Sequence, residues 1–172
     1  TTTYFGPPSP SLTGLAIVQL AKQGKLVLND LVIEYIPWFR VADAAATQRI
    51  TLNHLLHHTS GLSEAGFTVT LPENASKEEA VRALAAAELT APVGTTHQYF
   101  NVGYDVLALV IEQVSGISYE QYVQEHIFTP LDMTHSFTDP EAARQNGLSQ
   151  GYSRFFGFPI PARQPHRTYE IG

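Results

Sequence analysis

Two stretches of the chain repeat apolar residues at the spacing of an α-helix, and they constrain the fold more than any other feature. The first predicts an amphipathic helix over residues 11–23 that ends at Gly24. Its apolar face holds Leu12, Leu15, Ala16 and Leu20. The second predicts a helix over residues 101–114 that ends at Gly116. Its apolar residues are Val102, Leu107, Val110, Ile111 and Val114. The chain is therefore expected to be mainly α.

The rest of the chain adds shorter helices and few strands. Further helices are expected over residues 51–58, from 76 to 88, and from Ser118 to just before Pro130. Residues 40–48 resemble a loop, and the tail from Gly147 shows no helical pattern. Short strands are expected only near the ends of the chain. With 172 residues and no linker, residues 1–172 predict a single helical domain.

Composition excludes several classes of function. The net charge is -6 and the basic residues are scattered, so nucleic acid is not expected as a partner. The chain has no cysteine, which excludes disulfides, thiolate catalysis and cysteine-based zinc sites.

Four blocks of sequence, in the right order, resemble the serine β-lactamase-related family, which includes class C β-lactamases, DD-carboxypeptidases and related esterases. The first block is SLTGLAIVQL with GKLVLND, over residues 11–20 and 24–30. The second is ITLNHLLHHTSGL, over residues 50–62. The third joins PVG at 92–94 to YFNVGY at 99–104, and the fourth is PLDM at 130–133. The resemblance spans nearly the whole chain.

The resemblance implies a fold and a chemistry. In that family a helical domain is inserted into an α/β domain, so the chain is expected to be the helical insert domain of the β-lactamase/DD-peptidase-like serine hydrolase fold, a fragment of a larger enzyme. The family transfers acyl groups through a serine ester and uses no cofactor. Tyr99 would take or relay a proton, and Asn101 would hold the amide group of the substrate. Metal ligands are not expected.

The sequence departs from the family where the nucleophile belongs. The alignment places Pro7 at the serine position and Pro10 at the lysine position, and proline has neither a hydroxyl nor an amine. No other Ser-x-x-Lys occurs, and Lys-Thr-Gly is absent too. We therefore expect the chain alone to be inactive. A re-engineered start and a natural pseudo-enzyme are two origins that the sequence does not separate, and a non-catalytic peptide-binding or interdomain interaction module is the competing function.

Partners and location follow from the resemblance. The α/β domain of the parent enzyme is the expected partner, and a β-lactam, a peptide or an ester is the expected substrate. An extracytoplasmic or membrane-associated bacterial parent is implied. The tail also holds aromatic residues that predict self-association if no other domain covers them. These are Tyr152, Phe155, Phe156 and Phe158.

Each candidate residue also has a structural interpretation. Tyr99 could pack on the core, and Asn101 could cap the helix that begins at Val102. Three histidines at i, i+3 and i+4 have the spacing of a metal site, but structural roles are favoured for them. They are His54, His57 and His58. Three serines are considered as substitute nucleophiles and are disfavoured. Two lie at the N-terminus of the first helix with no lysine and no adjacent histidine, and the third lacks the Gly-x-Ser-x-Gly pattern of a nucleophile elbow. They are Ser9, Ser11 and Ser60.

Overall fold

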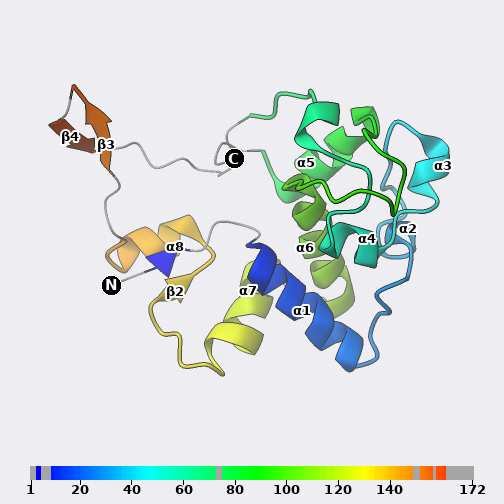
Figure 1. Cartoon of the computed structure of the whole chain (residues 1–172). Coiled ribbons are helices and arrows are strands. Elements are labelled where there is room, and N and C mark those ends of the chain that lie inside the picture. Colours follow the sequence, from blue (N-terminus) through cyan, green and yellow to red (C-terminus); the bar gives the residue numbers. More distant parts are fainter. Residues whose placement is uncertain (1–2, 5–8, 73–74, 149–151, 157, 162–172) are drawn as a thin grey trace.

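The fold is a helical body built around one long helix. The computed structural model describes residues 3–4, 9–72, 75–148, 152–156 and 158–161. Helix α6 (Val102–Ser115) runs through the middle of the body, and α1 (Pro10–Lys22) and α5 (Lys77–Ala83) pack against it (Figure 1). The two helices with the clearest apolar period thus form the centre of the molecule.

Helix α6 is buried because apolar residues occupy most of its surface. Val106, Leu107 and Ile111 are fully shielded from solvent. The helix ends where the sequence predicts, because Gly116 adopts a left-handed φ of 77° and its N–H bonds the Glu112 carbonyl.

Helix α1 is joined to the next layer through a buried polar contact. It begins at Pro10, whose missing N–H would find no partner in the first turn. Thr13 Oγ1 lies 2.9 Å from the Tyr119 hydroxyl, and both residues are fully buried. Helix α7 (Tyr119–Val123) carries Tyr119 and continues into a π-helical turn, Gln124–Phe128.

The remaining helices are short. They are α2 (Val32–Tyr35), α3 (Ala44–Thr47), α4 (Leu52–Leu56) and α8 (Pro140–Gln145), with 3-10 turns at Glu64–Gly66 and Leu84–Ala86. The loop expected over residues 40–48 is wrong, because Asp43 accepts the N–H groups of Ala45 and Ala46 and so caps α3. The helix expected over residues 51–58 ends two residues early, at Leu56.

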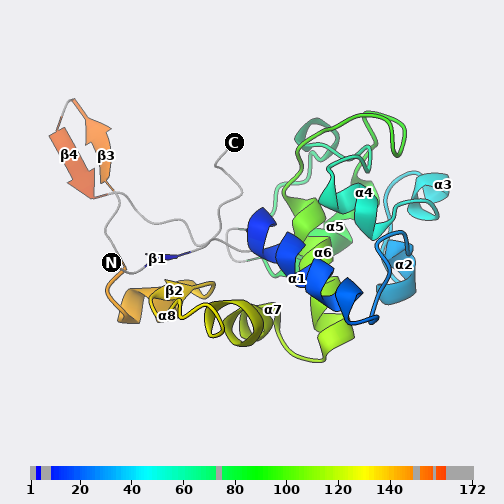
Figure 2. The ribbon, with the colours of Figure 1, turned by 60° about the horizontal axis from the view of Figure 1, so that its bottom comes forward.

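Strands lie towards the ends of the chain, as expected. Strand β1 (Thr3–Tyr4) pairs in parallel with β2 (Ser136–Phe137), and β3 (Tyr152–Phe155) pairs antiparallel with β4 (Phe158–Pro161). The β3–β4 hairpin stands apart from the helices in both views (Figures 1 and 2). Within the described ranges, no helix has the length and apolar character that crossing a membrane requires.

Candidate active site

The candidate site is built on two segments that run side by side, residues 58–66 and 88–98. Main-chain hydrogen bonds join them at intervals: Glu88 N–H to Gly66 O at 3.0 Å, Thr90 N–H to Gly61 O at 2.9 Å and Gly94 N–H to Thr59 O at 2.7 Å. The two segments approach very closely at Gly61. A Cβ there would lie 2.2 Å from the Ala91 carbonyl oxygen, and the φ of 82° also suits glycine.

His58 anchors the end of the second segment. Its carbonyl accepts the Gln98 N–H at 2.7 Å, and its ring Nδ1 accepts the Phe100 N–H at 3.3 Å. The ring contacts two tyrosines, with its centroid 4.7 Å from the centroid of the Tyr99 ring and 5.0 Å from that of the Tyr104 ring. Because Nδ1 accepts a hydrogen bond, the imidazole is neutral and carries its proton on Nε2.

Burial favours the same neutral form of His58. It lowers the pKa of the imidazole, and the nearby His97 and His57 lower the pKa further. The Tyr104 hydroxyl donates to the Leu56 carbonyl at 2.9 Å. Burial, and then the proximity of Tyr99, raise the pKa of Tyr104. The two side chains beside Tyr99, those of His58 and Tyr104, are therefore neutral and held by hydrogen bonds.

Tyr99 and Asn101 form a hydrogen-bonded pair. The Tyr99 hydroxyl donates to Asn101 Oδ1 at 2.9 Å, and the Tyr99 side chain is half exposed. Since Oδ1 is occupied, the Nδ2 group of Asn101 is left to donate its two protons elsewhere. It makes no hydrogen bond within the part of the chain that the structure describes. The pair presents a phenol and an amide donor to solvent.

A carboxylate borders the pair. Glu64 Oε1 accepts the Asn101 N–H at 3.3 Å, and Glu64 is exposed. It belongs to the 3-10 turn Glu64–Gly66, which Ser63 caps by accepting the Gly66 N–H. Asn101 is thus held from two directions, through its side chain by Tyr99 and through its backbone by Glu64.

The structure corrects one interpretation of Asn101. Its side chain makes no capping hydrogen bond to α6, although it directly precedes Val102. The interpretation as a helix cap is therefore wrong. The backbone of Asn101 is already close to helical, with φ -65° and ψ -45°. A capping Asn instead has extended backbone, from which its side chain accepts the N–H of the second or third residue after it.

The two prolines fall at and before the start of α1. Pro10 is the first residue of the helix, and Pro7 lies outside the described residues. Of the serines weighed as nucleophiles, Ser60 is 3% exposed and its Oγ accepts the Leu62 N–H at 3.3 Å. Ser9 stands at the N-cap of α1 without a side-chain hydrogen bond to the helix, and Ser11 is exposed on its first turn.

The three histidines do not share a helix face, because α4 ends at Leu56 and His58 turns away with a φ of 54°. His54 Nδ1 accepts the Thr51 N–H at 3.2 Å, and His57 Nδ1 lies 3.0 Å from the Asn53 carbonyl. Burial lowers the pKa of His54. Among the described residues, no group of three His, Cys, Asp or Glu side chains could hold a metal ion.

Sequence reasoning missed two residues of this site. His58 is interpreted from the sequence as a structural histidine, with a metal ligand as the disfavoured alternative, and its place in the HHTSGL block is the signal that could point to the site. Glu64 lies 35 residues before Tyr99, and no motif pointed to it. Both residues act through contacts with the segment that carries Tyr99, which a local sequence pattern does not reveal.

Sequence comparison finds relatives among penicillin-binding-protein-like proteins. The Beta-lactamase family model matches residues 11–169. The chain is 37% identical over 131 residues to Protein flp of Staphylococcus aureus strain MW2, which covers 73% of this chain and 26% of that protein. It is 36% identical over 139 residues to the putative penicillin-binding protein PbpX of Bacillus subtilis strain 168, covering 79% of this chain and 32% of that protein. The chain therefore spans about a third or less of these relatives.

Solved structures give the same result. The octameric penicillin-binding protein homologue from Pyrococcus abyssi superposes with a TM-score of 0.75 at 30% identity, covering 91% of this chain and 37% of that chain. EstCE1, a hydrolase with promiscuous acyltransferase activity, superposes with a TM-score of 0.65 at 27% identity, covering 90% and 43%. The order of the sequence blocks, the family match and these structures all indicate the same family. The chain belongs to the beta-lactamase family of penicillin-binding-protein-like serine hydrolases.

Proposed function

We propose that the chain is the helical domain of a serine hydrolase and supplies the Tyr99–Asn101 arm of an acyl-transfer site. The observation that carries this proposal is the 2.9 Å hydrogen bond from the Tyr99 hydroxyl to Asn101 Oδ1 on an exposed, well-anchored segment. In the whole protein the substrate would be a β-lactam, a peptide or an ester. Asn101 Nδ2 would donate to the carbonyl of the substrate amide, and Tyr99 would exchange a proton with the attacking or leaving group.

The chain alone is expected to lack the chemical step. Acyl transfer needs a nucleophile with a base beside it, and the aligned positions hold Pro7 and Pro10. A neighbouring cation favours the charged form of a phenol, which is the form that can accept a proton. The missing lysine would have been such a cation. Both proline positions therefore remove a group that Tyr99 would work with.

A non-catalytic peptide-binding module is the second candidate. Pro10 favours it, because proline suits the first turn of a helix and α1 forms fully behind it. The chain would then keep the binding arm and the helical fold while the chemistry is lost.

The α/β domain of a larger hydrolase is the partner that we propose. Leu15 is 42% exposed and Val18 is 50% exposed on the outer side of α1, the helix that leads from the nucleophile positions. A domain seated there would cover both side chains and face the start of α1.

Intact-protein mass spectrometry tests whether the chain can be acylated. The chain is incubated with a reactive penicillin and, separately, with an activated ester. We expect no stable mass increment while circular dichroism shows a folded helical protein. An increment that maps to Ser9, Ser11 or Ser60 would overturn the assignment of the missing nucleophile.

A titration with an N-acylated dipeptide tests the binding arm. NMR should show a shift of the Asn101 side-chain amide as the peptide is added. Asn101→Ala should abolish binding, whereas Tyr99→Phe should keep the Nδ2 donor and weaken binding less. Binding that is equal in Asn101→Ala and in the unmodified chain would contradict the role of Asn101 in either candidate function.

A further inference from the structure

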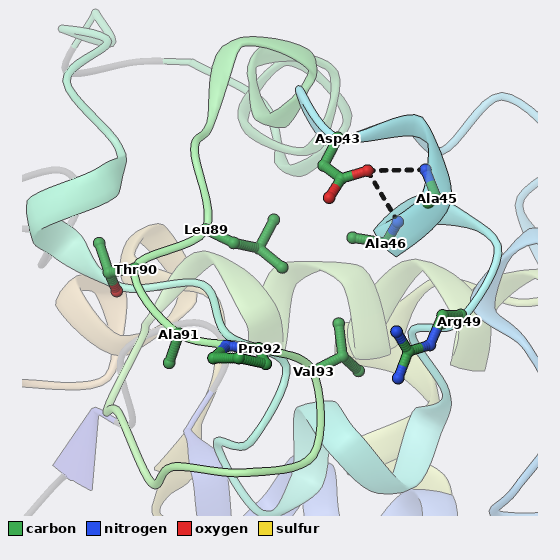
Figure 3. A pocket seen from close by; sticks show the side chains of 9 residues that line it. All are labelled: Asp43, Ala45, Ala46, Arg49, Leu89, Thr90, Ala91, Pro92 and Val93. Carbon is green, nitrogen blue, oxygen red and sulfur yellow. Dashed lines mark hydrogen bonds between the residues drawn. The ribbon is translucent and has the colours of Figure 1, made fainter.

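A pocket that neither Tyr99 nor Asn101 lines lies between helix α3 and residues 89–93 (Figure 3). Its volume is about 430 Å³, which is within the range of small-molecule sites. Ala46 and Val93 are buried and supply an apolar floor. Two charged residues also line it: Asp43, which precedes α3 in the chain, and Arg49, which follows it.

Both charged side chains keep a free group for a ligand. One oxygen of Asp43, Oδ1, accepts the Ala45 and Ala46 N–H groups, at 2.7 and 3.2 Å. The other oxygen, Oδ2, has no hydrogen-bond partner among the described residues, and Figure 3 shows it pointing away from these two amides. The Arg49 guanidinium lies beside Val93 in the same view and makes no hydrogen bond or ion pair within the described ranges.

The two charges favour a ligand that carries both an ammonium and a carboxylate group. Asp43 is the N-cap of α3, and Arg49 follows the last residue of that helix, Thr47, by two positions. Both side chains line the pocket, so a ligand that spans it can meet the carboxylate at one end and the guanidinium at the other.

The backbone beside the pocket has an open edge. The N–H groups of Glu88 and Thr90 donate to carbonyls of the 58–66 segment. Because successive N–H groups of an extended chain point to opposite sides, the Leu89 N–H points away from that segment. On that opposite side, the Ala87 carbonyl accepts the Ala42 N–H at 3.1 Å. Two residues later the pairing stops: the Leu89 N–H makes no hydrogen bond among the described residues, and the pocket begins there.

We propose that this pocket binds a short zwitterionic peptide with small apolar side chains. The peptide lies extended along the open edge at Leu89. Asp43 Oδ2 accepts from its ammonium group, and the Arg49 guanidinium donates to its carboxylate. Its side chains contact Ala46 and Val93. This site does not require the proposed acyl-transfer function, because it shares no residue with Tyr99 and Asn101.

An NMR titration of the 172-residue chain at low salt tests the proposal. The probes are Ala-Ala, N-acetyl-Ala-Ala, Ala-Ala amide and the doubly blocked N-acetyl-Ala-Ala amide. We expect saturable shifts of the Ala45, Leu89 and Ala91 amides with Ala-Ala. Blocking either end should weaken binding about two- to fivefold, the effect of one exposed charge pair, and added salt should weaken it as well.

Two variants test the residues. Asp43→Asn keeps an oxygen that caps α3 but removes the charge, and Arg49→Met removes the guanidinium. Each should weaken Ala-Ala binding by a similar factor and abolish the discrimination against the peptide blocked at the matching end. Arg144→Met on α8 is the control and should leave binding unchanged.

Four results would overturn the proposal. They are the absence of saturable shifts, equal affinity for the zwitterionic and doubly blocked peptides, unchanged affinity in both variants, and shifts confined to Tyr99 and Asn101. The last result would assign the peptide to the candidate active site, which would support the proposed function while removing this second site.

Discussion

Left-handed backbone at a residue other than glycine is unfavourable, and His58 adopts it with a φ of 54°. The conformation is maintained because the residue makes three kinds of contact that need this position. Its carbonyl accepts the Gln98 N–H, its Nδ1 accepts the Phe100 N–H, and its ring contacts the rings of Tyr99 and Tyr104. A single residue therefore fixes the segment that presents the candidate active site.

Substitutions of His58 should separate the backbone contribution from the ring contribution. His58→Ala removes the ring and leaves a left-handed residue with a Cβ, so we expect unfolding to become easier by about 1–3 kcal/mol. Asparagine tolerates left-handed backbone, so His58→Asn should lose less. Urea unfolding followed by circular dichroism measures both values. Equal losses in the two variants would contradict the backbone argument, and no loss in either would contradict the anchoring role.

The lowered pKa of His58 gives stability a definite dependence on pH. The unfolded chain binds a proton near pH 6.5, whereas the folded chain binds it only at lower pH. The contribution of neutral His58 to the free energy of unfolding is therefore fully present above pH 6.5 and is lost as the pH falls below that value. His54 has a lowered pKa too and acts in the same direction.

We expect the free energy of unfolding to decrease between pH 7.5 and pH 5.5. Urea unfolding at both values measures the decrease. His58→Asn should reduce the decrease by removing one of the two groups. A decrease of the same size in that variant would assign the pH dependence to other residues, and stability that rises as the pH falls would contradict the sign.

At the scale of elements, Lys77 holds three helices together. Its Nζ lies 2.9 Å from Glu112 on α6 and 2.7 Å from Glu120 on α7, and the lysine side chain is only 16% exposed. Burial alone would lower its pKa, but the hydrogen bonds and charges of Glu120 and Glu112 outweigh burial and raise it. The ammonium group also lies 5.5 Å from the centre of the Tyr119 ring.

Replacing Lys77 by methionine should destabilise the helical body by about 1–3 kcal/mol, because two glutamates then face each other without a cation. Arg144→Met is the matched control. Arg144 pairs with Glu141 at 3.3 Å on one exposed helix, so its removal should change stability by less than about 1 kcal/mol. Thermal unfolding compares the two. A larger effect for Arg144 than for Lys77 would contradict the role of Lys77 as a link between helices.

The sequence predicts a helix well when its apolar residues repeat over several turns. It predicts a helix poorly when a few polar contacts determine whether the helix forms. Helices α1 and α6 each begin and end within about one residue of their predicted ends, because apolar spacing and glycine define them. Helix α3 was missed, since four residues carry no period and the Asp43 cap alone defines it. A family block identifies Tyr99 and Asn101, whose side chains are hydrogen-bonded to each other, but their partners His58 and Glu64 depend on tertiary contacts.

At the scale of the whole molecule, large apolar side chains are exposed on two surfaces. One is the outer face of α1, with Leu15 and Val18. The other is the hairpin β3–β4, where Phe156 is 88% exposed and Phe158 is 73% exposed. Side chains of this size exposed close together favour association with another surface. The expectation of self-association therefore stays a prediction, and it has two candidate surfaces.

Light scattering across a concentration series tests that prediction. We expect the mass of the chain to rise above that of a monomer at high concentration, since each apolar surface loses contact with water when two copies meet. Leu15→Lys with Val18→Lys should abolish the rise if the α1 face is responsible, and Phe156→Ser with Phe158→Ser should abolish it if the hairpin is. Val27→Lys is the control, because Val27 is 60% exposed in a turn outside both surfaces. A chain that stays monomeric at every concentration would show that neither surface mediates self-association. The α1 face would then remain available for the α/β domain that we propose.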